Sequence, residues 1–209
     1  MDILDWNEYL KIDEGYPATT NMVYVPLSNP DGNLLCMDFG NERIKFDNDF
    51  FFEREVYFLK RFKKYKWAPE VLEVDYSNKR IFIKWYQETC NNIIFSDRTL
   101  EEYCIDWKQQ LLNIVRDIES QQVLKLNLYP HCFFIDDKQT MRAMDFYASV
   151  DKNNTVYPTQ LIENLISKKS KHRWDQVILN DQIDFEKFYF NAINEHIIDW
   201  PGHPLKELI

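Results

Sequence analysis

A lysine and a glutamate near residue 50 have the types and spacing of a buried ion pair. In "DFFFEREVYFLKRFKKY", residues 49–65, Glu55 shares one helix face with the phenylalanines four residues before it and three and seven residues after it. A carboxylate on that apolar line faces the protein interior, where an isolated charge is costly, so it requires a cation. Lys45, in the strand-like stretch "RIKF", alternates with two apolar neighbours and is the candidate cation.

Two interpretations of Glu55 remain open from the residues alone. In the first, Lys45 and Glu55 pair, and the lysine is aimed at the phosphates of a nucleotide. In the second, Glu55 lies at the edge of the apolar stripe and reaches solvent. Burial of Glu55 distinguishes the two.

The elements that would position these residues follow an α+β order. Alternating apolar residues and turn signals predict strands at 22–27, 34–39 and 43–46 and hairpins at 70–86 and 131–147. Helical spacing predicts helices at 49–65, 100–120, 158–168, 172–180 and 184–198. We therefore expect a β-rich N-lobe with one helix, residues 1–86, and a mainly helical C-lobe, residues 87–209, which together form one domain.

Composition excludes several classes of protein. The formal net charge of −9 argues against a protein that coats nucleic acid, although a local basic cleft remains open. The four cysteines show no zinc spacing and read as buried thiols in a reducing compartment. The acidic start "MDILDWNEYL" does not resemble a signal peptide, and no apolar run is long enough to span a membrane. We expect a cytoplasmic protein.

The segment "LKLNLYPHCFFIDDKQTMRAMDFYASV", residues 124–150, resembles the catalytic segment of the protein kinase-like superfamily, especially its small aminoglycoside- and lipopolysaccharide-type kinases. That family has a His-Gly-Asp or His-Arg-Asp stretch, a proline, an asparagine, two strands and then Asp-Phe-Gly. The order extends outward to the helix at 100–120 and to the helix that carries Glu55, and it covers residues 22–150. The resemblance implies a two-lobed kinase-like fold.

The resemblance also implies a role for individual residues. Asp145 in "AMDFY" stands where the family holds Mg²⁺, whereas Asp38 in "CMDFG" comes too early in the chain and reads as a strand end. Lys45 and Glu55 stand where the family holds the phosphates of ATP, and Gly32 in "SNPDGN" is the one glycine of the expected phosphate-covering loop. The alternative for Asp145 is a carboxylate that caps a loop.

Several positions depart from the family pattern. Asn127 stands where the catalytic aspartate belongs, after Lys125-Leu126, and Cys132 stands at the second metal ligand. Tyr147 replaces the glycine of the triplet. An amide cannot act as a general base, whose help is worth roughly 10²–10⁴ in rate. A thiol is a poor ligand for magnesium, which prefers oxygen.

These departures leave three functional hypotheses. The leading one is a pseudokinase that retains a nucleotide-binding cleft. The second is an active, ATP-dependent phosphotransferase acting on a small molecule, a sugar or a lipid head group, in which Asp145 binds Mg²⁺ and Lys45 binds phosphates. The third is a protein-interaction module that binds no nucleotide. The sequence identifies neither the substrate nor the protein partner.

Residues beside the motif also have two interpretations each. His131 is either a substitute base or an ordinary surface residue of the loop. Asp136 and Asp137 are turn residues, or one of them supports a metal ion. Trp200 in "DWPGHP" is expected to dock an ordered C-terminal turn.

Overall fold

The computed structural model describes the following residues of the chain: 9–11, 22–26, 34–39, 48–84, 88–96, 98–147, 149–153, 178–179, 182–183 and 185–209. The predicted strand at 43–46 with Lys45, the glycine Gly32 and the predicted helix at 158–168 lie outside these ranges. Residues 85–87 do as well, so the lobe boundary near residue 87 stays a prediction.

Alternating apolar residues in the N-terminal part build a five-stranded sheet. Its strands are β1 (Tyr9–Lys11), β2 (Met22–Pro26), β3 (Leu34–Asp38), β4 (Val71–Asp75) and β5 (Arg80–Lys84). Their order is β1-β2-β3-β5-β4, and every neighbouring pair is antiparallel. The predicted strands β2 and β3 and the predicted β4–β5 hairpin are confirmed, whereas β1 was not predicted.

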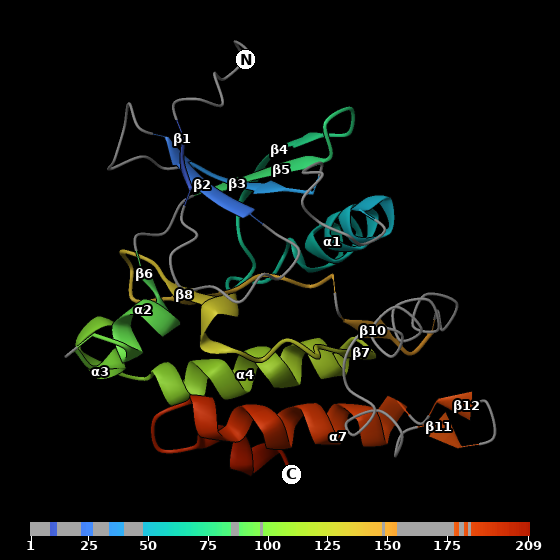
Figure 1. Cartoon of the computed structure of the whole chain (residues 1–209). Coiled ribbons are helices and arrows are strands. Elements are labelled where there is room, and N and C mark those ends of the chain that lie inside the picture. Colours follow the sequence, from blue (N-terminus) through green and yellow to red (C-terminus); the bar gives the residue numbers. More distant parts are fainter. Residues whose placement is uncertain are drawn as a thin grey trace.

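The helix α1 (Asn48–Phe62) covers one face of this sheet (Figure 1). Successive residues of a strand point to opposite faces, so Leu35 and Met37 of β3 and Ile81 and Ile83 of β5 share one side. These four are buried in the same apolar cluster as the phenylalanine-rich side of α1, whereas the buried Cys36 lies outside that cluster. The helix ends at Phe62, three residues before the predicted end.

A helical part lies at the other end of the molecule (Figure 1). Its main helices are α4 (Trp107–Ser120) and α7 (Phe185–His196), and shorter helices are α2 (Cys90–Ile94) and α3 (Leu100–Tyr103). α7 confirms the prediction at 184–198, and α2 lies in a stretch where no element was predicted. Together with the five-stranded sheet, these helices confirm the α+β class.

The prediction of one helix over 100–120 is wrong, because the chain leaves the helix at Cys104. Cys104 has extended dihedral angles, φ −152° and ψ 102°. Asp106 is the N-cap residue of the second helix, and short polar residues of this kind favour helix starts; its carboxylate accepts from the side-chain amide of Gln110 at 2.8 Å. The helix restarts at Trp107, so the apolar spacing continues across a break that periodicity does not reveal.

Short strands complete the helical part. β6 (Glu88–Thr89), β8 (Phe133–Ile135) and β9 (Met141–Ala143) form an antiparallel sheet, which confirms the second predicted hairpin. β7 (Val123–Leu124) pairs with β10 (Val150–Asp151). β11 (Ile178–Leu179) pairs with β12 (Gln182–Ile183), so the predicted helix at 172–180 is wrong at its end. The residues at 178 and 179 are β-branched and aliphatic, types that also suit a strand, so helical spacing alone did not distinguish the two.

The C-terminal turn docks as predicted. After α7 come the 3-10 helices η3 (Ile197–Asp199) and η4 (Pro204–Leu208), with Trp200 between them and 1% exposed. The indole N–H of Trp200 donates to the carbonyl oxygen of Leu128 at 2.8 Å, and its ring stacks on Trp107 at 5.7 Å. Leu128 belongs to the segment between β7 and the 3-10 helix η2 (Pro130–Cys132). The hydrogen bond from Trp200 therefore holds that segment in place.

Two simpler expectations can be compared with the structure. All four cysteines are free and buried, as predicted. None of the helices in the described ranges combines the length and the apolar composition needed to cross a bilayer.

Replacing Trp200 with alanine should lower the free energy of unfolding by about 3–5 kcal/mol, because a fully buried ring and its hydrogen bond are both lost. Urea denaturation followed by circular dichroism measures the change. Ile198→Ala is the control, since Ile198 is 76% exposed and its loss should cost less than about 0.5 kcal/mol. Equal stability of the two variants would contradict the docking role of Trp200.

Candidate functional site

Glu55 is a buried carboxylate that reaches from α1 to the segment after Asp145. Its side chain is 0% exposed, so the interpretation in which it reaches solvent is wrong. Its Oε2 accepts a hydrogen bond from the backbone N–H of Tyr147 at 2.7 Å. Its Oε1 has no hydrogen-bond partner among the described residues. The helix is therefore joined to the "AMDFY" stretch through a buried carboxyl group.

Arg54 extends this junction. Charged residues of α1 such as Arg54 are expected on the side opposite the phenylalanines, and for Arg54 this expectation is wrong, because its side chain is only 4% exposed. Its Nε donates to the carbonyl oxygen of Tyr147 at 2.7 Å, and its guanidinium also donates to the carbonyl oxygen of Ser149. A long cationic side chain can leave an exposed helix face when backbone carbonyls elsewhere satisfy its donors.

The next turn of α1 contacts the same segment. The hydroxyl of Tyr57 donates to Asp151 Oδ2 at 2.8 Å, and Arg61 forms an ion pair with that carboxylate. α1 is thus held against residues 147–151 along two of its turns. This arrangement places Glu55 over the backbone that follows Asp145.

Lys125 is the buried cation that sequence reasoning did not select. Its side chain is 0% exposed, and its Nζ donates to the carbonyl oxygens of Met144 at 2.6 Å and Asp145 at 2.9 Å. The ammonium also lies 4.6 Å from the centre of the Phe146 ring. The sequence signal for this burial is the position of the lysine within the apolar run "VLKLNL". The site residue missed by the sequence therefore lies in the loop, and it anchors the backbone of Asp145.

The side chains of His131, Cys132 and Asp145 lie close together, next to the backbone that Lys125 holds. Asp145 has a left-handed backbone, φ 60°, which aspartate tolerates better than most residues. Cys132 Sγ lies 3.5 Å from Asp145 Oδ2. One ligating atom from each of His131, Cys132 and Asp145 lies within 4.8 Å of the others. Cys132 and Asp145, which the resemblance aligned with two metal-ligand positions of the family, are therefore neighbours in the structure.

His131 is not an ordinary surface residue. It is half-buried in η2, and its ring stacks on Tyr129 at 5.1 Å with an angle of 12° between the planes. Burial lowers the pKa of the imidazole, and Lys125 acts in the same direction, while Asp145 and Asp199 raise it. A neutral imidazole beside a carboxylate is a metal ligand or a hydrogen-bond partner.

Electrostatic effects at the site follow from burial. Burial, followed by repulsion from Asp145, raises the pKa of Glu55 to about 8, although Lys125 and the backbone N–H groups of Tyr147 and Phe146 act to lower it. Burial and then Asp145 also raise the pKa of the Cys132 thiol, against Lys125. The ammonium of Lys125 itself has a lowered pKa because of burial, while the nearby acids raise it. Burial therefore disfavours the charged forms of Glu55, Cys132 and Lys125 alike.

The remaining sequence candidates have separate locations. Asn127 is half-buried on the segment between β7 and η2, and its role as the altered catalytic base stays a prediction. Lys45 and Gly32 lie outside the described residues. Asp38 ends β3 and lies 3.5 Å from the guanidinium of Arg80, so the strand interpretation of "CMDFG" is confirmed.

Asp136 has a turn role, as expected. Its Oδ1 accepts from the backbone N–H groups of Lys138 and Thr140, both at 2.9 Å, and its Oδ2 pairs with Arg142 at 2.8 Å. These bonds close the β8–β9 turn. They also occupy the carboxylate oxygens that would otherwise be available to a metal ion.

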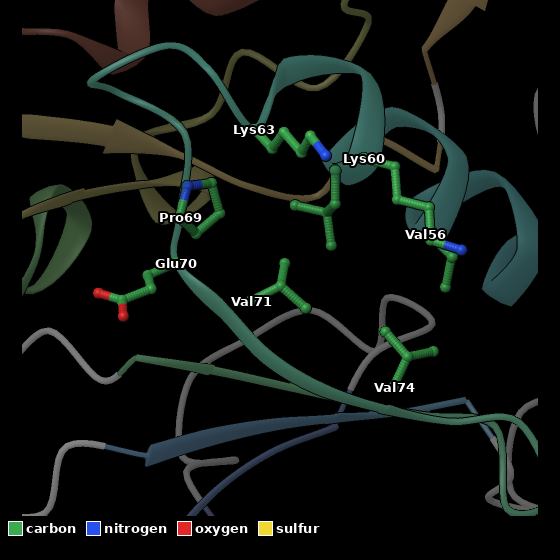
Figure 2. A pocket seen from close by; sticks show the side chains of 8 residues that line it. Val56, Lys60, Lys63, Pro69, Glu70, Val71 and Val74 are labelled. Atoms are coloured by element: carbon green, nitrogen blue, oxygen red, sulfur yellow. The ribbon is translucent and has the colours of Figure 1, made fainter.

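A pocket of about 270 Å³ lies on a different face of α1 (Figure 2). It opens between α1 and β4, and Val56 and Leu59 of the helix line it opposite Val71. Neither Glu55 nor Asp145 lines this pocket. The apolar pocket and the charged junction are therefore separate features of the same helix.

Comparisons with known proteins do not show a family for this chain. No family model matches the sequence, and no curated protein matches it. A crystal structure of WbdD superposes with a TM-score of 0.49 and 12% sequence identity, over 93% of this chain and 48% of the WbdD chain. This chain thus spans about half the length of that one. A TM-score below 0.5 does not establish a common fold.

Replacing Lys125 with methionine should lower the free energy of unfolding by about 3–5 kcal/mol, because Glu55 and Asp145 lose their buried cation. At pH 8.5, above the pKa of about 8 of Glu55, the same change in a Glu55→Gln background should cost at least about 1 kcal/mol less. A double-mutant cycle in urea measures this coupling. Lys138→Met, at an exposed position, is the control and should have little effect. Additive costs of the two changes would contradict the electrostatic coupling.

The raised pKa of Glu55 also predicts a pH dependence. Between its ordinary pKa of 4.5 and the folded value of about 8, the folded protein keeps a proton that the unfolded chain has lost. The free energy of unfolding should therefore fall as pH rises through that window, by up to about 1.4 kcal/mol per pH unit from this group. Glu55→Gln should flatten the profile, whereas Glu53→Gln, on the exposed side of α1, should keep it. Parallel profiles for wild type and Glu55→Gln would refute the shift.

Proposed function

We propose that the chain is a two-lobed, kinase-like protein that binds a nucleotide between its lobes and has lost efficient phosphoryl transfer. The β-rich N-lobe would supply Lys45 and Glu55, and the helical C-lobe would supply Asp145. The α+β order of the chain and the hairpin before Asp145 support this interpretation.

One observation carries the proposal: Glu55 on α1 meets the segment of Asp145. The two stretches are about ninety residues apart in sequence, yet Glu55 accepts from the N–H of Tyr147 at 2.7 Å. Their charges also interact, because Asp145 raises the pKa of Glu55. The resemblance implies that a helix carboxylate and a metal-position carboxylate converge, and the hydrogen bond from Tyr147, two residues after Asp145, supports that proposal. Lys45, in the chain just before α1, is the expected third member.

Loss of catalysis follows from the replaced residues. Asn127 offers an amide where a general base would take a proton from the substrate hydroxyl, and such a base is worth roughly 10²–10⁴ in rate. Tyr147 replaces the glycine after Asp145-Phe146, and it is held in place by its N–H bond to Glu55 and by ring contact with Phe51 at 5.4 Å. The segment is therefore fixed rather than free to rearrange around a substrate.

The donor atoms next to Asp145 do not fit magnesium. Mg²⁺ requires near-octahedral coordination by oxygen, and it is held in proteins by carboxylates, phosphates and water. Here one carboxylate stands between a thiol and an imidazole. Nucleotide binding in this proposal rests on Lys45, and no step is assigned to magnesium.

A thermal-shift titration with ATP tests the proposal. ATP at ten times its dissociation constant should raise the melting temperature by several degrees, since a ligand that binds only the folded state adds about 1.4 kcal/mol at that concentration. Lys45→Ala should abolish the rise, and Lys66→Ala, at an exposed position, should preserve it. Wild type should release no ADP above background, and Asn127→Asp should raise any residual release.

Two outcomes would contradict this function. The absence of any shift at millimolar ATP, with and without Mg²⁺, would favour the interaction module. Rapid ADP formation that is lost in Lys45→Ala would instead support an active phosphotransferase.

A further inference from the structure

We propose that His131, Cys132 and Asp145 bind a borderline transition-metal ion, and that Zn²⁺ is the ion their donor atoms fit best. The three residues come from two segments, η2 and the stretch after β9, and one donor atom of each lies within 4.8 Å of the other two. Imidazole nitrogen, thiolate sulfur and carboxylate oxygen are the three ligand types that zinc takes in proteins. The inference does not depend on nucleotide binding, because the protein supplies all three donors.

The spacing of two donors already matches zinc. In a tetrahedral site with Zn–S of about 2.3 Å and Zn–O of about 2.0–2.2 Å, the sulfur and the oxygen lie roughly 3.5–3.7 Å apart. Cys132 Sγ and Asp145 Oδ2 are 3.5 Å apart. The imidazole needs a displacement on the order of 1 Å to complete a face of the tetrahedron. Three protein ligands leave the fourth position to water, which is the arrangement of an open zinc site.

The backbone around the donors is already held in place. The N–H of Cys132 donates to the carbonyl oxygen of Tyr129, and the carbonyl oxygen of Cys132 accepts from Met144, both at 2.9 Å. Lys125 Nζ donates to the carbonyl oxygen of Asp145 at 2.9 Å. Little conformational freedom is therefore lost when a metal binds, which is the usual requirement for a tight site.

The charge of the surroundings also favours a divalent cation. Asp145 contributes a buried carboxylate next to Cys132, and Asp199 adds negative charge on the side of His131. Zinc takes cysteine as the thiolate, so its binding would release the proton of the Cys132 thiol.

Cobalt binding tests the site directly. The full chain, reduced and freed of metal with chelator, is titrated with Co²⁺ in the absence of nucleotide. We expect one equivalent to bind with a thiolate-to-cobalt charge-transfer absorption, and one equivalent of Zn²⁺ to displace it, while millimolar Mg²⁺ does not. Native mass spectrometry should show one zinc ion per chain.

Matched variants identify the ligands. Cys132→Ser should remove the charge-transfer absorption, and Cys36→Ser, which alters a buried cysteine of β3, should retain it. His131→Ala and Asp145→Asn should each weaken zinc binding roughly tenfold or more. His131 is half-buried, so its variant keeps the test valid if Cys132→Ser fails to fold.

Three results would overturn the site: no charge-transfer absorption in wild type at one equivalent of Co²⁺, an unchanged absorption in Cys132→Ser, or unchanged zinc affinity in His131→Ala. Because nucleotide is absent, failure here leaves the ATP-dependent thermal shift unaffected. A missing ATP shift would likewise leave the cobalt result standing.

Discussion

Burial of the Glu55 carboxylate is the constraint on which the rest of the structure depends. A charge with no access to water is stable only when fixed groups replace its hydration. The backbone N–H of Tyr147 supplies one such group, and the nearby ammonium of Lys125 supplies the opposite charge. Both come from the segments that surround Asp145. The position of α1 therefore follows from an electrostatic requirement as well as from apolar packing.

The contacts that α1 makes with the residues after Asp145 join the sheet to the helical part. Arg54 and Arg61 contact the backbone and the carboxylate of residues 147–151, on either side of Glu55 along the helix. Phe58 and Phe62 pack against Phe146 at ring distances of 6.5 and 5.2 Å. One continuous buried cluster extends from β3 through α1 and α4 to the C-terminal turn. Polar and apolar contacts thus act on the same short stretch, which leaves Asp145 little freedom.

The same interior limits the chemistry that Asp145 can support. Low dielectric strengthens every interaction among Lys125, Glu55 and Asp145, so each charge depends on the other two. A thiol and an imidazole next to Asp145 replace the oxygen donors that magnesium would need. Asp145 therefore has sulfur and nitrogen neighbours in place of further oxygen donors.

The sequence by itself determined the α+β class, the apolar faces of the strands and of α1, and the docking of Trp200, because period and apolar composition report which side faces the core. Only the tertiary structure decided the helix break at Cys104 and the burial of Glu55, Arg54 and Lys125. The burial of these charged groups depends on partners from distant segments, which spacing along one chain does not encode. A buried charge is stable only where folding brings a counter-charge or hydrogen-bond partners next to it, and only the tertiary structure shows which residues these are.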